Sequence, residues 1–230
     1  MGIVKVSVFV SVVVFISLFV TFKKEAIACE AIHASHFEEI HPNVFTDPTV
    51  TNKQIASLLM SITLAHERIN QVYGEMSAAP RIIATNNLAY QKFGLNPTGM
   101  QSSGFARECI FLGPKGMNVD VIAHELVHAE VRYRTDLFTE LTQLPAWFIE
   151  GTAIKVDYRT PFLIENIALT EQEITQIKSV FFLHDFKSSH VKSYQASRMA
   201  IEELDPQALY SGLARLNKGE RFEEVFGMSQ

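Results

Sequence analysis

The residues of this chain best placed to do chemistry form one short run, His124-Glu125-Leu126-Val127-His128. Residues four apart on a helix share a face, so the two imidazoles can point at the same ion. Glu125 lies beside them, close enough to take a proton from a water held by that ion. Two imidazoles and a base on a rigid element are what a zinc-dependent hydrolase needs, although the same residues also occur on ordinary amphipathic helices.

A second run, LPAWFIEGTA over residues 144–153, can complete the set of metal ligands. Two histidines leave zinc one protein ligand short of the usual catalytic set, and a carboxylate is a common third ligand. Glu150 would by default be a surface helix residue, but it follows a run of apolar side chains, which indicates that it points inward. A buried carboxylate needs a partner. We therefore expect one zinc ion (Zn2+) per chain, held by His124, His128 and Glu150.

At these residues the chain resembles a known group, the thermolysin-like metallopeptidases called gluzincins. Their third zinc ligand is a glutamate on the next helix, in a pattern often written W-x-x-E-G-x-A, which here reads Trp147-x-x-Glu150-Gly151-x-Ala153. The resemblance is specific over about residues 105–155. It implies a zincin-like fold in a minimal single-domain form, and a zinc metallopeptidase that hydrolyses peptide bonds.

The resemblance also implies roles for residues outside the ligand set. With zinc lowering the pKa of its bound water, Glu125 would act as general base and would then protonate the leaving amine. A further donor would stabilise the oxyanion, and in the family this is a Tyr or His from the later helices. Tyr194 is the first choice here, and His184 and His190 are the alternatives. For Tyr194 the competing interpretation is a ring packed on the core. For the two histidines it is a position in a solvated loop.

The residues that orient the two imidazoles are less clearly marked. The family often places an acidic residue four positions after the glutamate ligand, but Ile154 occupies that position here. Asp120, one turn before the first histidine, and Asp157, two turns past the glutamate, are the candidates. Glu130 is expected on the solvated face of its helix.

Two features bear on the substrate. In this family the strand before the H-E-x-x-H helix binds the substrate backbone as an added strand, and residues 105–112 resemble that element. The aminopeptidases of the clan carry G-x-M-E-N near this strand, whereas the nearest match here, GMQSS at residues 99–103, lacks the glutamate that grips a free amine. An endopeptidase acting on a peptide or protein substrate is therefore favoured.

Composition sets limits on the rest of the molecule. Of the 230 residues, 47% are hydrophobic and 20% are charged, and residues 29–230 are enough for a single domain with a substantial core. The net charge of −5 gives no electrostatic reason to expect nucleic acid as a partner. The chain lacks room for large specificity domains, which indicates a minimal catalytic unit, and we expect a monomer.

Residues 1–28 are expected to lie outside that domain. An unbroken apolar run over residues 6–22 predicts a signal peptide cleaved after a small-x-small segment at residues 26–28, or a membrane anchor retained by the two lysines that follow the run. A lipoprotein signal at Cys29 is disfavoured by the charged residues before it. Each interpretation puts this segment in contact with a membrane or translocon, and makes the protein secreted, periplasmic or membrane-anchored with its catalytic domain outside the cytoplasm.

The two cysteines, Cys29 and Cys109, are compatible with export. In an oxidising compartment they can pair and fix the N-terminal segment to the sheet; a free tail cysteine and a buried core cysteine are the alternative. Three histidines, His33, His36 and His41, lie close together in the sequence near Cys29. A mobile, hydrated stretch is expected there, with an accessory metal site as the alternative.

The spacing of apolar residues, caps and turns predicts an α+β fold, with a small mixed sheet and a helix over residues 29–117 and a mostly helical part, opened by the active-site helix, over residues 118–230. The expected strands lie at 43–46, 81–85 and 105–112, and the expected helices at 51–73, 118–134, 194–204 and 220–225, with further helix starts at Thr170 and Asp205. Residues 86–103 are expected to form a long loop.

Three classes of function are compatible with these residues. The first is a zinc-dependent endopeptidase, which the paired motifs favour. The second is a non-peptidase zinc hydrolase that uses the same three ligands. The third is a catalytically silent, zinc-stabilised binding module. Glu125 argues against the third, because a binding module has no need of a base at that position.

Overall fold

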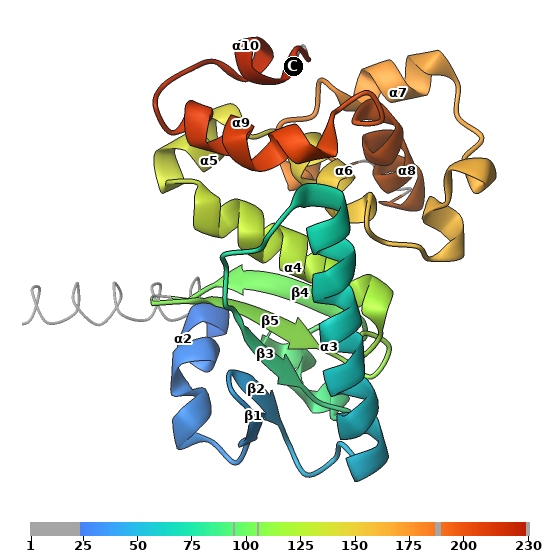
Figure 1. Ribbon diagram of the computed structural model, residues 1–230. Coiled ribbons are helices and arrows are strands. Elements are labelled where there is room, and N and C mark those ends of the chain that lie inside the picture. The colour runs from blue at the N-terminus through green and yellow to red at the C-terminus, as the bar shows by residue number, and fades with distance from the viewer. Residues whose placement is uncertain (1–23, 94, 105, 187–189, 229–230) are drawn as a thin grey trace, which may run out of the picture.

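The computed structural model describes residues 24–93, 95–104, 106–186 and 190–228 (Figure 1). The apolar run of residues 6–22 lies outside the described residues. Within the described ranges, none of the helices combines the length and the apolar character needed to cross a membrane. The fold is α+β as predicted, because a small mixed sheet lies in the first half of the chain and the second half is mostly helical.

Among the described residues, five short strands form the sheet, which lies in the lower part of the molecule in Figure 1. They are β1 (Glu38–His41), β2 (Val44–Thr46), β3 (Arg81–Ala84), β4 (Gly99–Ser103) and β5 (Glu108–Leu112). Their order across the sheet is β1-β2-β3-β5-β4. The three central strands are parallel to one another, whereas β1 and β4 run antiparallel to their neighbours. The two antiparallel strands therefore form the edges of the sheet.

The sheet buries both of its faces, because successive side chains in a strand point to opposite sides. Ile82 of β3 pairs with Val44 and Ile110 of the neighbouring strands, and all three lie in the main core. The next residue along β3, Ile83, pairs with Phe45, and these two lie in a smaller core on the other face. A shift of register by one residue would exchange the two sets, so this pairing is strongly specified.

Two long helices, α3 (Asn52–Tyr73) and α4 (Val119–Arg134), contribute to the main core. α3 begins after Thr51, which forms a capping box, and it ends at Gly74, whose φ of 96° suits a residue without a side chain. α4 begins after Asn118, whose side chain accepts a hydrogen bond from a backbone N–H of the first turn at 3.1 Å. The sequence predicts α3 from its apolar periodicity and the glycine that ends it, and α4 from its cap at Asn118.

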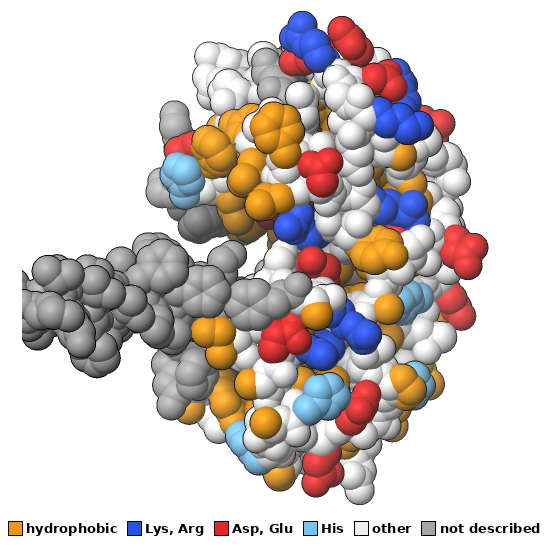
Figure 2. All heavy atoms as spheres, turned by 90° about the vertical axis from the view of Figure 1, so that its left-hand side faces the viewer, with side chains coloured by type: hydrophobic (Ala, Val, Ile, Leu, Met, Phe, Trp, Pro, Cys, Tyr) orange, Lys and Arg blue, Asp and Glu red, His pale blue; other side chains and the backbone are white. Residues whose placement is uncertain are grey.

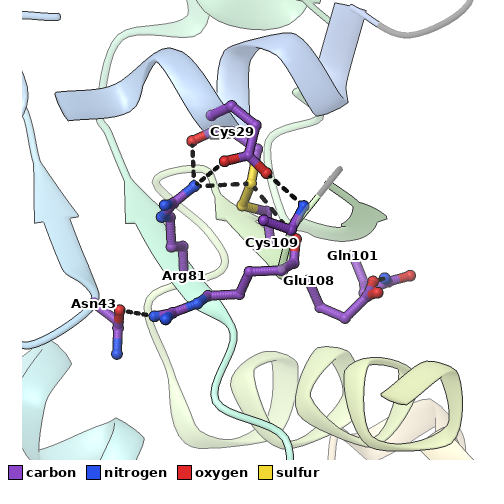
Figure 3. Close-up of a disulfide and its surroundings, with 9 residues drawn as sticks. Cys29, Asn43, Arg81, Gln101, Glu108 and Cys109 are labelled. Atoms are coloured by element: carbon purple, nitrogen blue, oxygen red, sulfur yellow. Dashed lines mark hydrogen bonds and ion pairs between the residues drawn. A yellow bond between two sulfur atoms is a disulfide. The ribbon is translucent and has the colours of Figure 1, made fainter. Parts of the chain in front are cut away.

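The smaller core is closed by α2 (Lys24–Glu30) and a following 3-10 turn (Ala31–Ala34). Cys29 of α2 forms a disulfide with Cys109 of β5, so the pairing interpretation of the two cysteines holds (Figure 3). Arg81 of β3 strengthens the connection by donating a hydrogen bond to the backbone oxygen of Cys29 at 3.1 Å. The disulfide thus fixes the start of the described chain to the sheet, and α2 itself extends across the domain boundary expected at residue 28.

The described residues of the C-terminal part, which lies above α4 in Figure 1, form six α-helices. They are α5 (Leu137–Gln143), α6 (Ala146–Ile154), α7 (Glu171–Ile177), α8 (His190–Ala200), α9 (Leu209–Leu216) and α10 (Phe222–Phe226). Thr170 forms the predicted capping box at the start of α7. α8 begins and ends four residues earlier than the sequence predicts. Its C-terminal end comes before Asp205, which precedes a proline and therefore disfavours helical backbone.

α6 and α8 cross closely at Gly151. A Cβ atom added at this glycine would lie 2.5 Å from the backbone oxygen of Ser197 and 3.0 Å from the side chain of Ile201. The two helices can approach this closely only because Gly151 has no side chain. The crossing places α8, which carries Tyr194, beside the helix that carries Glu150.

Residues 86–103 do not form the long loop that the sequence predicts. They contain a 3-10 turn (Leu88–Phe93) and the edge strand β4. β4 pairs with β5 along its whole length, from Gly99 opposite Leu112 to Ser103 opposite Glu108. Its polar sequence has little strand preference of its own, so the pairing partner decides its conformation.

α5 is a second element that the sequence analysis did not anticipate. It begins after Asp136, whose side chain accepts a hydrogen bond from the backbone N–H of Thr139 at 2.7 Å. Three of its large apolar side chains are exposed: Leu137 at 58%, Phe138 at 76% and Leu141 at 56%. Figure 2, which looks onto the side of the molecule that carries α2 and α5, shows hydrophobic side chains gathered on the upper half of this face.

Candidate metal centre

α4 and α6 bring the three expected ligands together. His124 Nε2 and His128 Nε2 lie 3.0 Å apart, and each lies 3.5 Å from Glu150 Oε2. The histidines come from successive turns of α4, and Glu150 is buried on α6, as its apolar neighbours indicate. Within the described ranges, these three side chains are the one group of His, Cys, Asp or Glu residues close enough together to hold a metal ion.

The spacing of these atoms suits a tetrahedral zinc ion. Zinc binds histidine nitrogen and carboxylate oxygen at about 2.0–2.2 Å, so two ligand atoms of a tetrahedral site lie about 3.3 Å apart. The separations of 3.0, 3.5 and 3.5 Å fall on either side of that value. Glu150 Oε2 is buried and has no well-oriented hydrogen-bond donor among the described residues. A buried carboxylate in that position must be paired with a positive charge or coordinate a metal.

The electrostatics of the site favour positive charge. Burial lowers the pKa of His124, but the carboxylates of Asp157 and Glu150 outweigh burial and raise this pKa to about 10. Burial likewise raises the pKa of Glu150, but His128 and His124 outweigh it and hold this pKa well below its usual range. A metal ion binds neutral imidazole, so a metal entering this site would displace a proton.

Glu125 is held between the ligand cluster and the edge strand β4. Its side chain is 7% exposed, and burial raises its pKa. The Gln101 backbone of β4 forms a hydrogen bond with it. Gly99 leaves room for the carboxylate, since a Cβ atom there would lie 3.2 Å from Glu125 Cγ and 3.2 Å from Oε1. A positioned carboxylate of raised pKa is better suited to accept a proton in catalysis than an exposed one.

Of the two candidates for orienting an imidazole, Asp157 is the one that faces a ligand. Its side chain is completely buried, and Oδ2 lies 3.5 Å from His124 Nδ1. Arg159 holds this carboxylate, donating from Nε to Oδ1 at 2.8 Å. Asp120 instead forms an ion pair with Arg68 of α3 at 2.6 Å. Asp157 therefore faces Nδ1 of His124, the ring nitrogen on the other side from Glu150, where it could orient the ring.

The prediction that Glu130 lies on the solvated face of α4 is wrong. Its carboxylate is buried and accepts hydrogen bonds from the backbone N–H groups of Ser77 at 2.9 Å and Ala78 at 2.7 Å. Arg134 completes the arrangement with an ion pair. The apolar periodicity of α4 indicates which side of the helix faces the sheet. It gives no information about the segment after α3, which packs against another side of the helix.

Tyr194 is half-buried in α8, with its ring centroid 6.3 Å from that of Phe162 and 5.6 Å from that of Phe186. The ring therefore packs on the core, as one of the two interpretations proposed. Burial, together with the charges of Glu150 and Glu125, raises the pKa of its hydroxyl to about 12. The negative charges of the two carboxylates favour the protonated form of the hydroxyl. The hydroxyl can therefore donate a hydrogen bond.

The two alternative donors are placed less favourably or not described. The His184 side chain is 77% exposed and lies 3.3 Å from Asp185 Oδ1, in agreement with the solvated-loop interpretation. The side chain of His190, at the start of α8, lies outside the described residues. Tyr194 remains the predicted oxyanion donor.

The edge strand that contacts Glu125 of α4 is β4, not the strand predicted at residues 105–112. That prediction corresponds to β5, which lies between β3 and β4 and is paired on both sides. An added strand needs a free edge. The GMQSS segment at residues 99–103 forms the edge strand, and it also contacts Glu125. In the sequence, this segment stands out only for its missing glutamate.

The N-terminal histidines do not gather at a metal site. His33 packs edge-on against Phe45, with 4.9 Å between ring centroids. His36 shares a hydrogen bond of 2.6 Å between its Nε2 and the Tyr90 hydroxyl. His41 is the last residue of β1. The three residues have separate partners, and none belongs to the metal-binding group found among the described residues.

Three contributors to the site have no signal in the local sequence. Gln101 and Gly99 hold and accommodate Glu125, and Arg159 holds the partner of His124. Each acts across elements that are distant along the chain. Comparison with protein-family models, with curated proteins and with solved structures finds no match. The assignment of this centre therefore depends on its own geometry.

Proposed function

We propose that this protein is a zinc-dependent endopeptidase that acts outside the cytoplasm. The observation that carries the proposal is the convergence of His124 Nε2, His128 Nε2 and Glu150 Oε2, with the Glu125 carboxylate held beside them. The ligand chemistry and spacing suit zinc, and a base next to a catalytic zinc is the arrangement of a hydrolase. The residues of the site match the two gluzincin motifs position by position.

Different residues of the chain would have different roles in peptide hydrolysis. Zinc, when bound, would act as a Lewis acid toward water and toward the substrate carbonyl. Glu125 would accept a proton from the attacking water and return it to the nitrogen of the leaving amine. The Tyr194 hydroxyl would donate a hydrogen bond to the carbonyl oxygen as negative charge develops there.

The substrate would bind as an extended strand along the edge of β4 that pairs with no other strand among the described residues. This edge supports the proposal because β4 is the last strand of the sheet and contacts Glu125. Backbone hydrogen bonds to β4 would hold a peptide whatever its side chains, as in other cases of strand addition. Such binding suits an endopeptidase, because it does not require a free terminus.

The first test is metal content. The purified chain should contain about one zinc ion, and His124→Ala, His128→Ala and Glu150→Ala should each reduce zinc occupancy sharply. His184→Ala, in an exposed loop, is the matched control and should keep its zinc. Full occupancy in the Glu150→Ala protein would remove that residue from the ligand set.

The second test separates the base from the ligands. Glu125→Gln keeps the size of the side chain but cannot accept the proton, so it should retain zinc and lose about 10²- to 10⁴-fold in kcat on a casein or peptide-library substrate. Glu224→Gln, an exposed residue of α10, should have no effect. Nearly full activity in the Glu125→Gln protein would show that the proposed mechanism is wrong.

The same assay distinguishes the other classes of function. A zinc peptidase should cleave a peptide library, and a chelator should abolish the cleavage. A non-peptidase zinc hydrolase would bind zinc and leave peptides intact, while hydrolysing simple esters in a way that depends on Glu125. A zinc-stabilised binding module would lose thermal stability on chelation and show no hydrolysis with either substrate.

A further inference from the structure

We infer that the turn after α6, residues 156–159, is a positioning device for the metal centre, and that Arg68 of α3 and Asp120 of α4 clamp it in place. The inference rests on the zinc site of the proposed function, but not on peptidase activity. Its central contact is the one between Asp157 and His124, described above at 3.5 Å. Asp157 is held in that position by contacts from Arg159 and from the clamp.

Asp157 lies beyond the end of its helix, so α6 cannot orient it. α6 ends at Ile154, and the last backbone contacts are turn-like: Asp157 N–H donates to the oxygen of Ile154 at 3.0 Å. An acidic residue at position 154 would project from the helix itself. A carboxylate three residues later depends on the conformation of a turn, and a turn needs other contacts to be held.

Arg159 supplies the first of these contacts. Its backbone N–H donates to Asp157 Oδ1 at 3.1 Å, and its Nε lies 2.8 Å from Oδ1 and 3.0 Å from Oδ2. The guanidinium is planar and its N–H groups match the two carboxylate oxygens, so the contact fixes the orientation of the carboxylate as well as its position. Asp157 Oδ2 accepts from Arg159 and lies 3.5 Å from His124 Nδ1.

Arg68 and Asp120 hold the turn from the other side. Arg68 Nη1 donates both to Asp120 Oδ1 at 2.6 Å and to the backbone oxygen of Val156 at 2.7 Å. Asp120 Oδ1 also accepts a hydrogen bond from the backbone N–H of Tyr158 at 3.3 Å. The Arg68 guanidinium lies 4.1 Å from the centroid of the Tyr158 ring. The residues on both sides of Asp157 are thus bound to α3 and α4.

Asp120 of the clamp and the candidate ligand His124 lie on the same side of α4. Asp120 and His124 are four residues apart on α4, so they lie on the same side of the helix, one turn apart. The turn is bound to α4 at Asp120 and presents Asp157 to α4 at His124. Any displacement of the turn along α4 would therefore change both contacts together. Partners of this kind fix the ring orientation of a histidine ligand.

The test is a double-mutant cycle with zinc affinity as its readout. Asp157→Asn keeps the shape of the side chain but replaces a charged acceptor with a neutral amide, so the dissociation constant for zinc should rise about 10- to 100-fold. Asp120→Asn should raise it about three- to tenfold, acting through the turn. In the double variant, Asp120→Asn should add less than about twofold, because its effect passes through Asp157.

Affinity would be measured by competition with a chromophoric chelator, and the absorption spectrum of the cobalt(II)-substituted protein would report the ligand geometry. Both single variants should shift that spectrum. Glu130→Gln is the control, because it breaks a buried contact of the same helix and should lower the melting temperature without changing zinc affinity. If Asp157→Asn does not fold, Arg159→Gln tests the same contact and should weaken zinc binding in the same direction.

The possible results distinguish a positioning role of the clamp from a purely structural one. An Asp120→Asn protein with lower stability but unchanged zinc affinity and an unchanged cobalt spectrum would mean that the clamp is only structural. Effects that multiply in the double variant would mean that Asp120 does not act through Asp157. Either result would overturn the inference and leave the zinc site intact. Failure of the wild-type chain to bind zinc would overturn both the inference and the proposed function.

Discussion

Gly151→Ala tests whether the close crossing of α6 and α8 positions the site. Alanine normally stabilises a helix interior relative to glycine, by about 1 kcal/mol. Here the added Cβ would lie 2.5 Å from the backbone oxygen of Ser197 and 3.0 Å from Ile201, so one helix must move. Overpacking costs about 1–3 kcal/mol, and we take about 3 kcal/mol because a backbone oxygen cannot rotate away.

The expected net loss is therefore about 2 kcal/mol of unfolding free energy. For a chain of this length, each kcal/mol lowers the melting temperature by about 2–4 °C, so the variant should melt about 4–8 °C lower. Thermal unfolding would be followed by circular dichroism in the presence of a chelator, so that metal binding does not contribute. Zinc affinity, measured separately, should also fall, because residue 151 adjoins Glu150.

Gly212→Ala in α9 is the matched control. It makes the same substitution inside a helix, but the nearest obstacles to its Cβ are the side chains of Phe226 and Val225 rather than backbone. Side chains can move more readily, so its stability loss should be the smaller of the two and its zinc affinity should not change. A Gly151→Ala protein as stable as the wild type, with full zinc affinity, would refute the role assigned to this crossing.

Three further predictions follow from particular contacts. Tyr194→Phe removes one hydroxyl and keeps the ring packing, so kcat should fall about 10²-fold with little change in KM or melting temperature, and an unchanged kcat would exclude the hydroxyl as oxyanion donor. Replacing both Cys29 and Cys109 by serine opens a loop of 80 residues and should cost up to about 4.5 kcal/mol in urea unfolding; a loss below about 1 kcal/mol would contradict the tethering role. Burial lowers the pKa of His66 below its usual 6.5, so the unfolded chain binds the proton more tightly and stability should decline as the pH falls below about 6.5. His66→Gln should make the unfolding free energy less dependent on pH below about pH 6.5, while the pH dependence above pH 7 should be the same in both proteins. Equal pH dependence in both proteins below pH 6.5 would argue against this assignment.

Local sequence was sufficient for the elements that carry the ligands. α4 begins after its predicted cap, Asn118, and presents two histidines four residues apart, because helix geometry depends on neighbouring residues alone. The inward direction of Glu150 followed from the apolar residues before it, since a helix side surrounded by apolar side chains is buried. The α+β class followed in the same way from the order of strand and helix patterns.

Only the tertiary structure decided which residues support the ligands. Asp120 and Asp157 were equal candidates in the sequence, and the contact with His124 distinguishes them because it joins residues on different elements. Glu130 was placed wrongly, since the burial of one helix side depends on a segment more than fifty residues away in the chain. β4 was missed because an edge strand of polar residues has no strong conformational preference until it pairs with β5. Contacts between distant segments depend on how the elements pack, and the local pattern of residues does not encode that packing.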